Sequence, residues 1–172
     1  IGGEDMSMFC YQCQEAAGGK GCTKVGVCGK TADVAALQDL MIYALKGISV
    51  LGIKADEINY TMEGLDRFII ESLFMTITNA NFDKDRFFAK IKDALKLRDE
   101  LKANLIEKGV DLGDLADSAT FTVTSNDEIE YKASSEKVGV LATENEDIRS
   151  LRELITYGLK GMAAYAEHAD NL

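Results

Sequence analysis

The sequence predicts a mainly helical, all-α protein. Three long segments carry apolar residues at spacings of three and four, which is the period of one helix face. A fourth segment of this kind, near the carboxyl terminus, repeats part of the first. The predicted architecture is a three-helix bundle preceded by a cysteine- and glycine-rich loop. A small β-hairpin and the first helix of a second, similar bundle follow it.

These elements divide the chain into five parts. The parts are a leader at 1–7, the cysteine-rich loop at 8–31, the three-helix bundle at 32–109, an acidic loop with the hairpin at 110–142, and the incomplete second bundle at 143–172. At 172 residues, with 47% hydrophobic and 28% charged side chains, the chain is long enough for one domain with a sizeable core. Folding therefore does not depend on disulfides.

Helical periodicity and glycine positions set the expected bounds of the first three helices. The first is expected over 32–51, with Gly52 ending it, and the second over 56–79. The third is expected over 83–108, with Gly109 ending it. Short connectors between helices of this length predict an up-down-up bundle. The residues expected to face its core are Leu37, Leu40, Met41, Ala44, Leu45, Ile48, Ile58, Met62, Leu65, Ile69, Leu73, Ile77, Phe87, Ile91, Leu95, Leu101 and Leu105.

The acidic segment after the bundle predicts a β-hairpin. Phe121–Thr124 and Ile129–Lys132 alternate between apolar and polar side chains, on either side of the turn-forming residues 125–128. This hairpin is expected to cover one end of the bundle.

A fourth helix is expected from Thr143 to about His168, with Thr143 and Glu146 forming a capping box at its start. LQDLMIYALKGIS at 37–49 aligns without gaps with LRELITYGLKGMA at 151–163. A shared Tyr-x-Leu-Lys-Gly in register is not required by helical period, so we interpret this helix as the opening of a second bundle. Its apolar face then needs a partner: the first bundle, another polypeptide segment, or a second copy in a homodimer.

Charge and hydropathy argue against several classes of partner. The formal net charge is −10, and no strongly basic stripe is present to contact nucleic acid. The uncharged apolar runs are shorter than a membrane span, and no secretion signal opens the chain. We therefore expect a cytoplasmic protein that binds neither nucleic acid nor membrane, in a compartment where thiols stay reduced.

All four cysteines lie within one stretch, MFCYQCQEAAGGKGCTKVGVCGK at 8–30, with the spacing C-x2-C-x8-C-x5-C. Its glycines allow the backbone to turn sharply. A C-x2-C pair lets two sulfurs face one centre, and two more thiolates from the same loop complete a four-sulfur shell. The candidate ligands of a metal or cofactor are Cys10, Cys13, Cys22 and Cys28.

Three kinds of site compete for this pattern. An iron–sulfur cluster is favoured, because it is wider than a single ion and suits long gaps between ligands. Structural zinc is the second interpretation, although four-cysteine zinc sites usually have two close pairs. Structural or redox-active thiols are the third. Spacing leaves all three open.

The cysteine loop is locally basic. Residues 10–30 carry Lys20, Lys24 and Lys30 against Glu15, a net charge of +2 in a chain whose net charge is −10. These cations would offset an anionic centre bound by four thiolates. Chance sampling of a short loop explains the charge equally well.

The segment MFCYQCQEAAGGKGCTKVGVCGKTADVAALQDLMIYALKGIS, beginning at Met8, resembles the amino terminus of the hybrid-cluster (prismane) protein family, assigned as hydroxylamine reductases. The resemblance continues in ESLFMTITNANFD at 71–83 and in NEDIRSLRELITYGLKGMAAYAEHA at 145–169. It implies that the four cysteines hold a 4Fe-4S cluster. It also implies a first domain of two three-helix bundles, in agreement with the repeat.

The resemblance implies an electron-entry domain without its reaction centre. Members of the family are much longer, and the rest of their chain holds a hybrid iron–sulfur–oxygen cluster whose ligands have no counterpart here. An external donor such as a ferredoxin or a reductase would reduce the 4Fe-4S cluster. Electrons would then pass to the hybrid cluster, where hydroxylamine is reduced to ammonia, and nitric oxide is a further proposed substrate.

Two functions are therefore weighed for this chain. The first is an electron-transfer domain that has no catalytic residues of its own and is inactive alone, with the remaining domains of the longer protein and the electron donor as partners. The alternative is a zinc- or thiol-stabilised helical module that binds another protein through its fourth helix.

Overall fold

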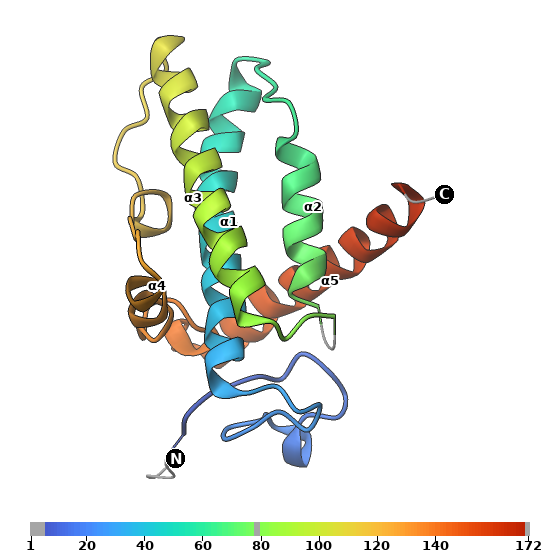
Figure 1. The fold of residues 1–172 in the computed structure, drawn as a ribbon. Helices are drawn as coiled ribbons and strands as arrows, with labels where there is room; N and C mark the ends of the chain where they lie inside the picture. Colours follow the sequence, from blue (N-terminus) through green and yellow to red (C-terminus); the bar gives the residue numbers. More distant parts are fainter. Residues whose placement is uncertain (1–5, 78–79, 171–172) are drawn as a thin grey trace.

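The computed structural model describes residues 6–77 and 80–170, which form the helical arrangement of Figure 1. The described residues form no strand, and one isolated antiparallel bridge joins Cys10 and Cys22. The predicted all-α class is confirmed. The helices are α1 (Ala32–Glu57), α2 (Leu65–Met75), α3 (Lys84–Glu107), α4 (Asn126–Ala133) and α5 (Glu146–Asp170), with 3-10 turns η1 (Ala17–Gly19), η2 (Asp117–Ala119) and η3 (Val140–Ala142).

Helix α1 is the centre of the molecule. It packs lengthwise against α3, while η2 and α4 contact other parts of its surface (Figure 1). Within the described ranges, it is the one helix long and apolar enough to cross a membrane, judged by length and composition alone. Most of that apolar stretch is buried against neighbouring elements, so α1 serves as the core helix of this bundle.

The first two helices differ from their predicted bounds. Helix α1 continues through Gly52 and ends at Glu57, where Asn59 takes a left-handed φ of 54°. Asparagine tolerates the left-handed conformation seen at Asn59. Gly52 lies inside the helix, where a glycine lowers helix stability but does not by itself end the helix. Helix α2 begins later than expected, after Gly64 with φ 79°. Helix α2 also ends earlier than predicted, at Met75, and residues 76–77 are not helical. Residues 78–79 of the predicted helix lie outside the described residues, as do residues 1–5 of the expected leader.

The third helix matches its prediction to within a residue or two. The Asp83 side chain caps the start of α3 by accepting hydrogen bonds from the amides of Asp85 (3.0 Å) and Arg86 (3.4 Å). After its end, Gly109 adopts a φ of 80°, the left-handed conformation that commonly terminates a helix.

The predicted β-hairpin is wrong, because residues Asn126–Ala133 form α4. Ser125 accepts a hydrogen bond from the Glu128 amide (3.2 Å), and Glu128 accepts one from the Ser125 amide (3.3 Å). This reciprocal capping box starts a helix at the residues interpreted as a turn. Ile129 and Ala133, four residues apart, are both buried, as the α1-facing side of a short helix requires.

Helix α5 begins at Glu146, but the predicted capping box at Thr143 is not formed. The Asn145 side chain accepts a hydrogen bond from the Ile148 amide (3.0 Å), whereas Thr143 accepts one from the Arg152 side chain (3.1 Å). Asparagine at 145 is two residues closer to the helix than Thr143 and accepts directly from the free amide.

One side of α5 packs across α2, and α5 extends away from the bundle toward the carboxyl terminus (Figure 1). Much of its apolar surface is exposed. The exposed large apolar side chains of α5 are Ile148, Leu151, Leu154, Ile155, Tyr157, Leu159, Met162 and Tyr165. The assignment of α5 to a second bundle stays a prediction.

Candidate metal centre

The cysteine loop lies at the end of the bundle where α1 begins (Figure 1). Cys10 and Cys22 are directly opposite each other in a short antiparallel bridge. The Cys10 amide donates to the Cys22 carbonyl (3.1 Å), and the Cys22 amide donates to the Cys10 carbonyl (2.8 Å). Cys22 is buried, while Cys13 and Cys28 are partly buried, as is Cys10, and all four thiols are free. The fold therefore gathers the four predicted ligands into one loop without linking any pair covalently.

A tight turn carries the last cysteine. The Gly26 amide donates to the Lys30 carbonyl (2.7 Å), and the Gly29 amide donates to the Gly26 carbonyl (2.8 Å). A Cβ atom added to Gly26 would lie 3.0 Å from the Cys28 sulfur. Glycine at position 26 therefore leaves room for that sulfur beside the backbone.

The donor set fits an iron–sulfur cluster or zinc in number and type. Four free thiols in one loop can supply a complete four-sulfur shell. Over the described ranges, however, no three His, Cys, Asp or Glu side chains converge closely enough to hold a metal ion. The fold thus brings the four cysteines into one region but does not bring their sulfurs to one point, and their assignment as ligands stays a prediction.

The basic residues of the loop occupy two different environments. Lys20 and Lys24 are exposed, whereas Lys30 is only 2% exposed. The Lys30 ammonium donates a hydrogen bond to the Cys10 sulfur at 3.6 Å. One of the three predicted charge-offsetting cations therefore contacts a predicted ligand directly.

A second buried lysine approaches the loop from α5. Lys160 is 3% exposed and donates to the Thr76 carbonyl at 3.4 Å. Burial lowers the pKa of Lys160 to about 8, partly opposed by the nearby carboxylate of Asp39. Burial likewise raises the pKa of Asp39 to about 7, against the attraction of Lys160.

Sequence reasoning did not identify Asp39 or Lys160. The repeat aligns Lys160 with Lys46, but Lys46 is exposed on α1. The sequence pattern therefore gave no signal that one of two equivalent lysines would be buried beside the cysteines.

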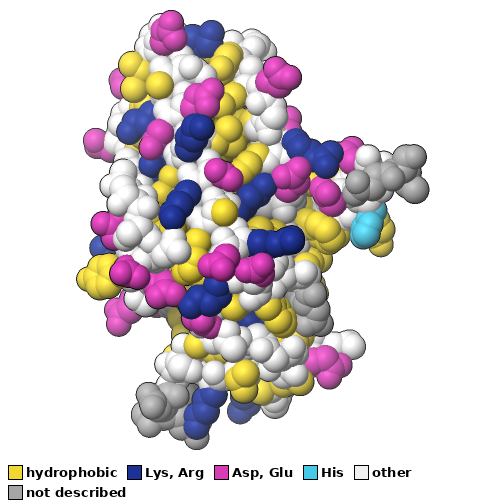
Figure 2. Space-filling model, viewed as in Figure 1, with side chains coloured by type: hydrophobic (Ala, Val, Ile, Leu, Met, Phe, Trp, Pro, Cys, Tyr) yellow, Lys and Arg dark blue, Asp and Glu magenta, His cyan; other side chains and the backbone are white. Residues whose placement is uncertain are grey.

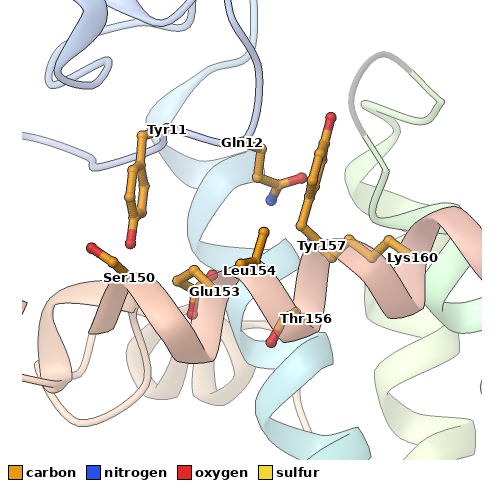
Figure 3. Close-up of a pocket in the computed structure, with 8 residues that line it drawn as sticks. All are labelled: Tyr11, Gln12, Ser150, Glu153, Leu154, Thr156, Tyr157 and Lys160. Atoms are coloured by element: carbon orange, nitrogen blue, oxygen red, sulfur yellow. The ribbon is translucent and has the colours of Figure 1, made fainter. Parts of the chain in front are cut away.

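A cavity of about 200 Å³ separates the loop from α5 (Figure 3). Tyr11 and Gln12 project into it from the loop, and α5 forms the opposite wall. The residues of that wall are Ser150, Glu153, Leu154, Thr156, Tyr157 and Lys160. The side chains of Tyr11 and Gln12 therefore face α5 across this cavity, close to the buried side chain of Lys160.

Comparisons with known proteins give a consistent result. The model of the Prismane/CO dehydrogenase family matches residues 8–172. The hydroxylamine reductase of Desulfitobacterium hafniense (strain DSM 10664 / DCB-2) is 59% identical over 165 residues, which are 95% of this chain and 30% of that protein. The hydroxylamine reductase of Clostridium novyi (strain NT) is 58% identical over 168 residues, 97% of this chain and 30% of that protein.

A third relative, the hydroxylamine reductase of Caldanaerobacter subterraneus subsp. tengcongensis, is 59% identical over 167 residues, again 97% of this chain and 30% of that protein. The chain thus spans about 30% of the length of these curated relatives. The family match begins at the first residue of the cysteine loop and continues through α5. The chain belongs to the Prismane/CO dehydrogenase family.

Proposed function

We propose that this chain is the amino-terminal 4Fe-4S electron-transfer domain of a hydroxylamine reductase. The observation that carries the proposal is the set of four free thiols gathered in one glycine-containing loop. Support also comes from relatives named hydroxylamine reductase, which align with 95–97% of this chain. The family match includes the whole loop.

In this proposal, Cys10, Cys13, Cys22 and Cys28 hold the cluster as thiolates. When bound, the cluster supplies one-electron transfer. The Cys10–Cys22 bridge fixes the two halves of the loop against each other, and the turn at Gly26 leaves room for the Cys28 sulfur. The protein's part is to bind the cluster, set its surroundings and connect it to a donor.

The activity of the longer protein is part of the same proposal. Reduction of hydroxylamine to ammonia and water consumes two electrons and two protons. A ferredoxin or a reductase would supply the electrons, and the hybrid cluster that uses them would be ligated by residues beyond this chain. We expect the 172-residue chain alone to bind a cluster without reducing hydroxylamine or nitric oxide, and we place the protein in the cytoplasm.

Metal and sulfide analysis tests the proposal. The chain is produced and purified without oxygen, and iron, zinc and acid-labile sulfide are measured per chain. We expect about four iron and about four sulfide ions. Cys13→Ser should lose most of both, whereas Thr23→Ser, a conservative change in the same loop, should keep them. One zinc ion without sulfide would contradict the proposal.

The exposed apolar face of α5 favours a second candidate, a zinc- or thiol-stabilised module that binds another protein. Leu151, Leu154 and Met162 are each more than 60% exposed. Such a surface commonly marks an interaction site. Zinc in place of iron and sulfide, together with a concentration-dependent increase in molecular mass, would support this alternative.

A further inference from the structure

Lys30 is placed where it can act on a cluster at the loop. Its side chain is 2% exposed, and its ammonium lies 3.6 Å from the Cys10 sulfur. Lysine is almost never fully buried unless it is paired, because removing its charge from water is costly. The hydrogen-bond acceptor found for this buried ammonium is a predicted cluster ligand.

Lys160 brings a second buried ammonium to the same region from a distant part of the sequence. It interacts electrostatically with Lys30, Asp39 and Cys10. A cavity of about 10 Å³, room for no more than one water molecule, is bounded in part by Cys10, Lys30, Asp39 and Glu153. Lys30 and Lys160 are buried, and Cys10, Asp39 and Glu153 are partly buried, so electrostatic interactions among these groups are screened less than at the surface.

The burial of Lys160 is not a general property of its sequence motif. Lys46 occupies the equivalent position of Tyr-x-Leu-Lys-Gly in α1 and is exposed to solvent. The motif thus allows a solvated lysine, but the fold places Lys160 inside, toward the cysteine loop. Two lysines close together in the interior repel each other. The carboxyl groups of Asp39 and Glu153 offset part of this repulsion, and an anionic centre at Cys10 would offset more of it.

Four thiolates outweigh the positive charge of an iron–sulfur core, and reduction makes the bound cluster more negative. A cation that donates a hydrogen bond to a ligand sulfur stabilises that added charge and raises the reduction potential. We propose that Lys30 and Lys160 form a buried cationic pair that raises the reduction potential of the cluster. Lys30 acts through Cys10 and Lys160 acts at longer range. This inference rests on the proposed function.

The test compares buried lysines with exposed ones in the 172-residue chain. The midpoint potential of the loaded protein is measured at pH 7 by redox titration, followed by electron paramagnetic resonance, for Lys30→Met and Lys160→Met. The matched controls are Lys24→Met, an exposed lysine of the same loop, and Lys46→Met, the exposed counterpart of Lys160. Iron and sulfide content is measured first for every variant.

We expect Lys30→Met to lower the equilibrium constant for reduction about tenfold relative to Lys24→Met, which is a shift of about 59 mV for one electron. Lys160→Met should shift the potential in the same direction by less, relative to Lys46→Met. If Lys30→Met does not retain a cluster, the comparison of Lys160→Met with Lys46→Met decides alone.

A loaded variant whose potential equals that of its control overturns this inference and leaves the proposed function intact. A wild-type chain that binds no iron and sulfide overturns the proposed function, and this inference with it.

Discussion

Gly47 contacts the backbone of η2, so we expect Gly47→Ala to destabilise the protein. A Cβ atom at this position would lie 2.5 Å from the Ser118 carbonyl carbon, 2.9 Å from the Ala119 Cα, and closer still to the Ser118 carbonyl oxygen. Cβ atoms essentially never approach other heavy atoms within 3.0 Å. Because the contacted atoms belong to the backbone, no side-chain rotation relieves the overlap, and α1 must move away from η2.

The magnitude follows from three contributions to the free energy of unfolding. Overpacking a well-packed site costs about 1–3 kcal/mol. Moving η2 also weakens the hydrogen bond that Tyr43 donates to Asp117 at 2.7 Å, a contact to a carboxylate on the order of 1 kcal/mol. Alanine favours a helix interior over glycine by about 1 kcal/mol, which acts in the opposite direction. We therefore expect Gly47→Ala to lower the free energy of unfolding by about 2 kcal/mol.

Gly161 provides the matched control, because the repeat aligns it with Gly47. A Cβ atom at Gly161 would meet no heavy atom within 4 Å, so Gly161→Ala should raise the free energy of unfolding by about 0.5–1 kcal/mol through helix propensity alone. Urea unfolding followed by far-ultraviolet circular dichroism measures both variants against the wild type. Equal stability of Gly47→Ala and Gly161→Ala would refute the reasoning.

Three further predictions concern the surroundings of the loop and helix α5. The pKa of Asp39 is raised from 3.8 to about 7, so between these pH values the folded state keeps a proton that the unfolded state releases. The free energy of unfolding should therefore fall by up to about 4 kcal/mol as the pH rises from 3.8 to about 7. Asp39→Asn should remove this fall, as measured by urea unfolding at pH 4 to 7; an unchanged pH profile would contradict the pKa shift. If α5 mediates a homodimer, Leu154→Glu should make the chain monomeric in analytical ultracentrifugation, whereas Tyr131→Glu, at an exposed residue of α4, should not. The double variant Lys20→Glu with Lys24→Glu should slow reduction by an acidic ferredoxin about tenfold in stopped-flow measurements at low salt, with a smaller effect at high salt.

Lys20 and Lys24 lie on the exposed surface of the cysteine loop. Both are exposed, as are the apolar side chains of Val25 and Val27 beside Cys28. Figure 2 shows basic side chains at the lower end of the molecule, the end where Figure 1 places the loop, whereas acidic and basic side chains are interspersed over the bundle above it. A negatively charged donor would therefore be attracted to this end more than to the rest of the surface.

Local signals in the sequence were sufficient to predict the bounds of a helix where one clear signal marked each end. The bounds of α3 follow from the capping carboxylate of Asp83 and the left-handed Gly109, and both act within one helical turn. The segment containing Ile129 and Ala133 fits strand alternation and helical spacing equally well, so periodicity alone was ambiguous. The capping box formed by Ser125 was the missed signal that distinguishes the two.

The surroundings of the cysteines depend on long-range packing, which sequence patterns do not encode. The four cysteines were identifiable from spacing, because all lie within a short stretch. Lys160 reaches that stretch only because α5 crosses α2 and places its ammonium against the Thr76 carbonyl. The charge of the loop was visible in the sequence, but the separation of exposed Lys24 from buried Lys30 was not.

The repeated motif shows how the same residues acquire different roles from different neighbours. In α1, Tyr43 donates to Asp117 and Gly47 packs on the backbone of η2. In α5, Tyr157 is 43% exposed and Gly161 faces open space, because no described element covers that side as η2 covers α1. The exposed side of α5 thus repeats the residues of a packing surface, and its assignment to a second bundle or a homodimer stays a prediction. Its buried Lys160 lies three residues from Tyr157 on the same side of the helix, and both residues line the cavity between α5 and the cysteine loop. Packing on this side of α5 and the electrostatics of the loop are therefore connected through neighbouring residues of one helix.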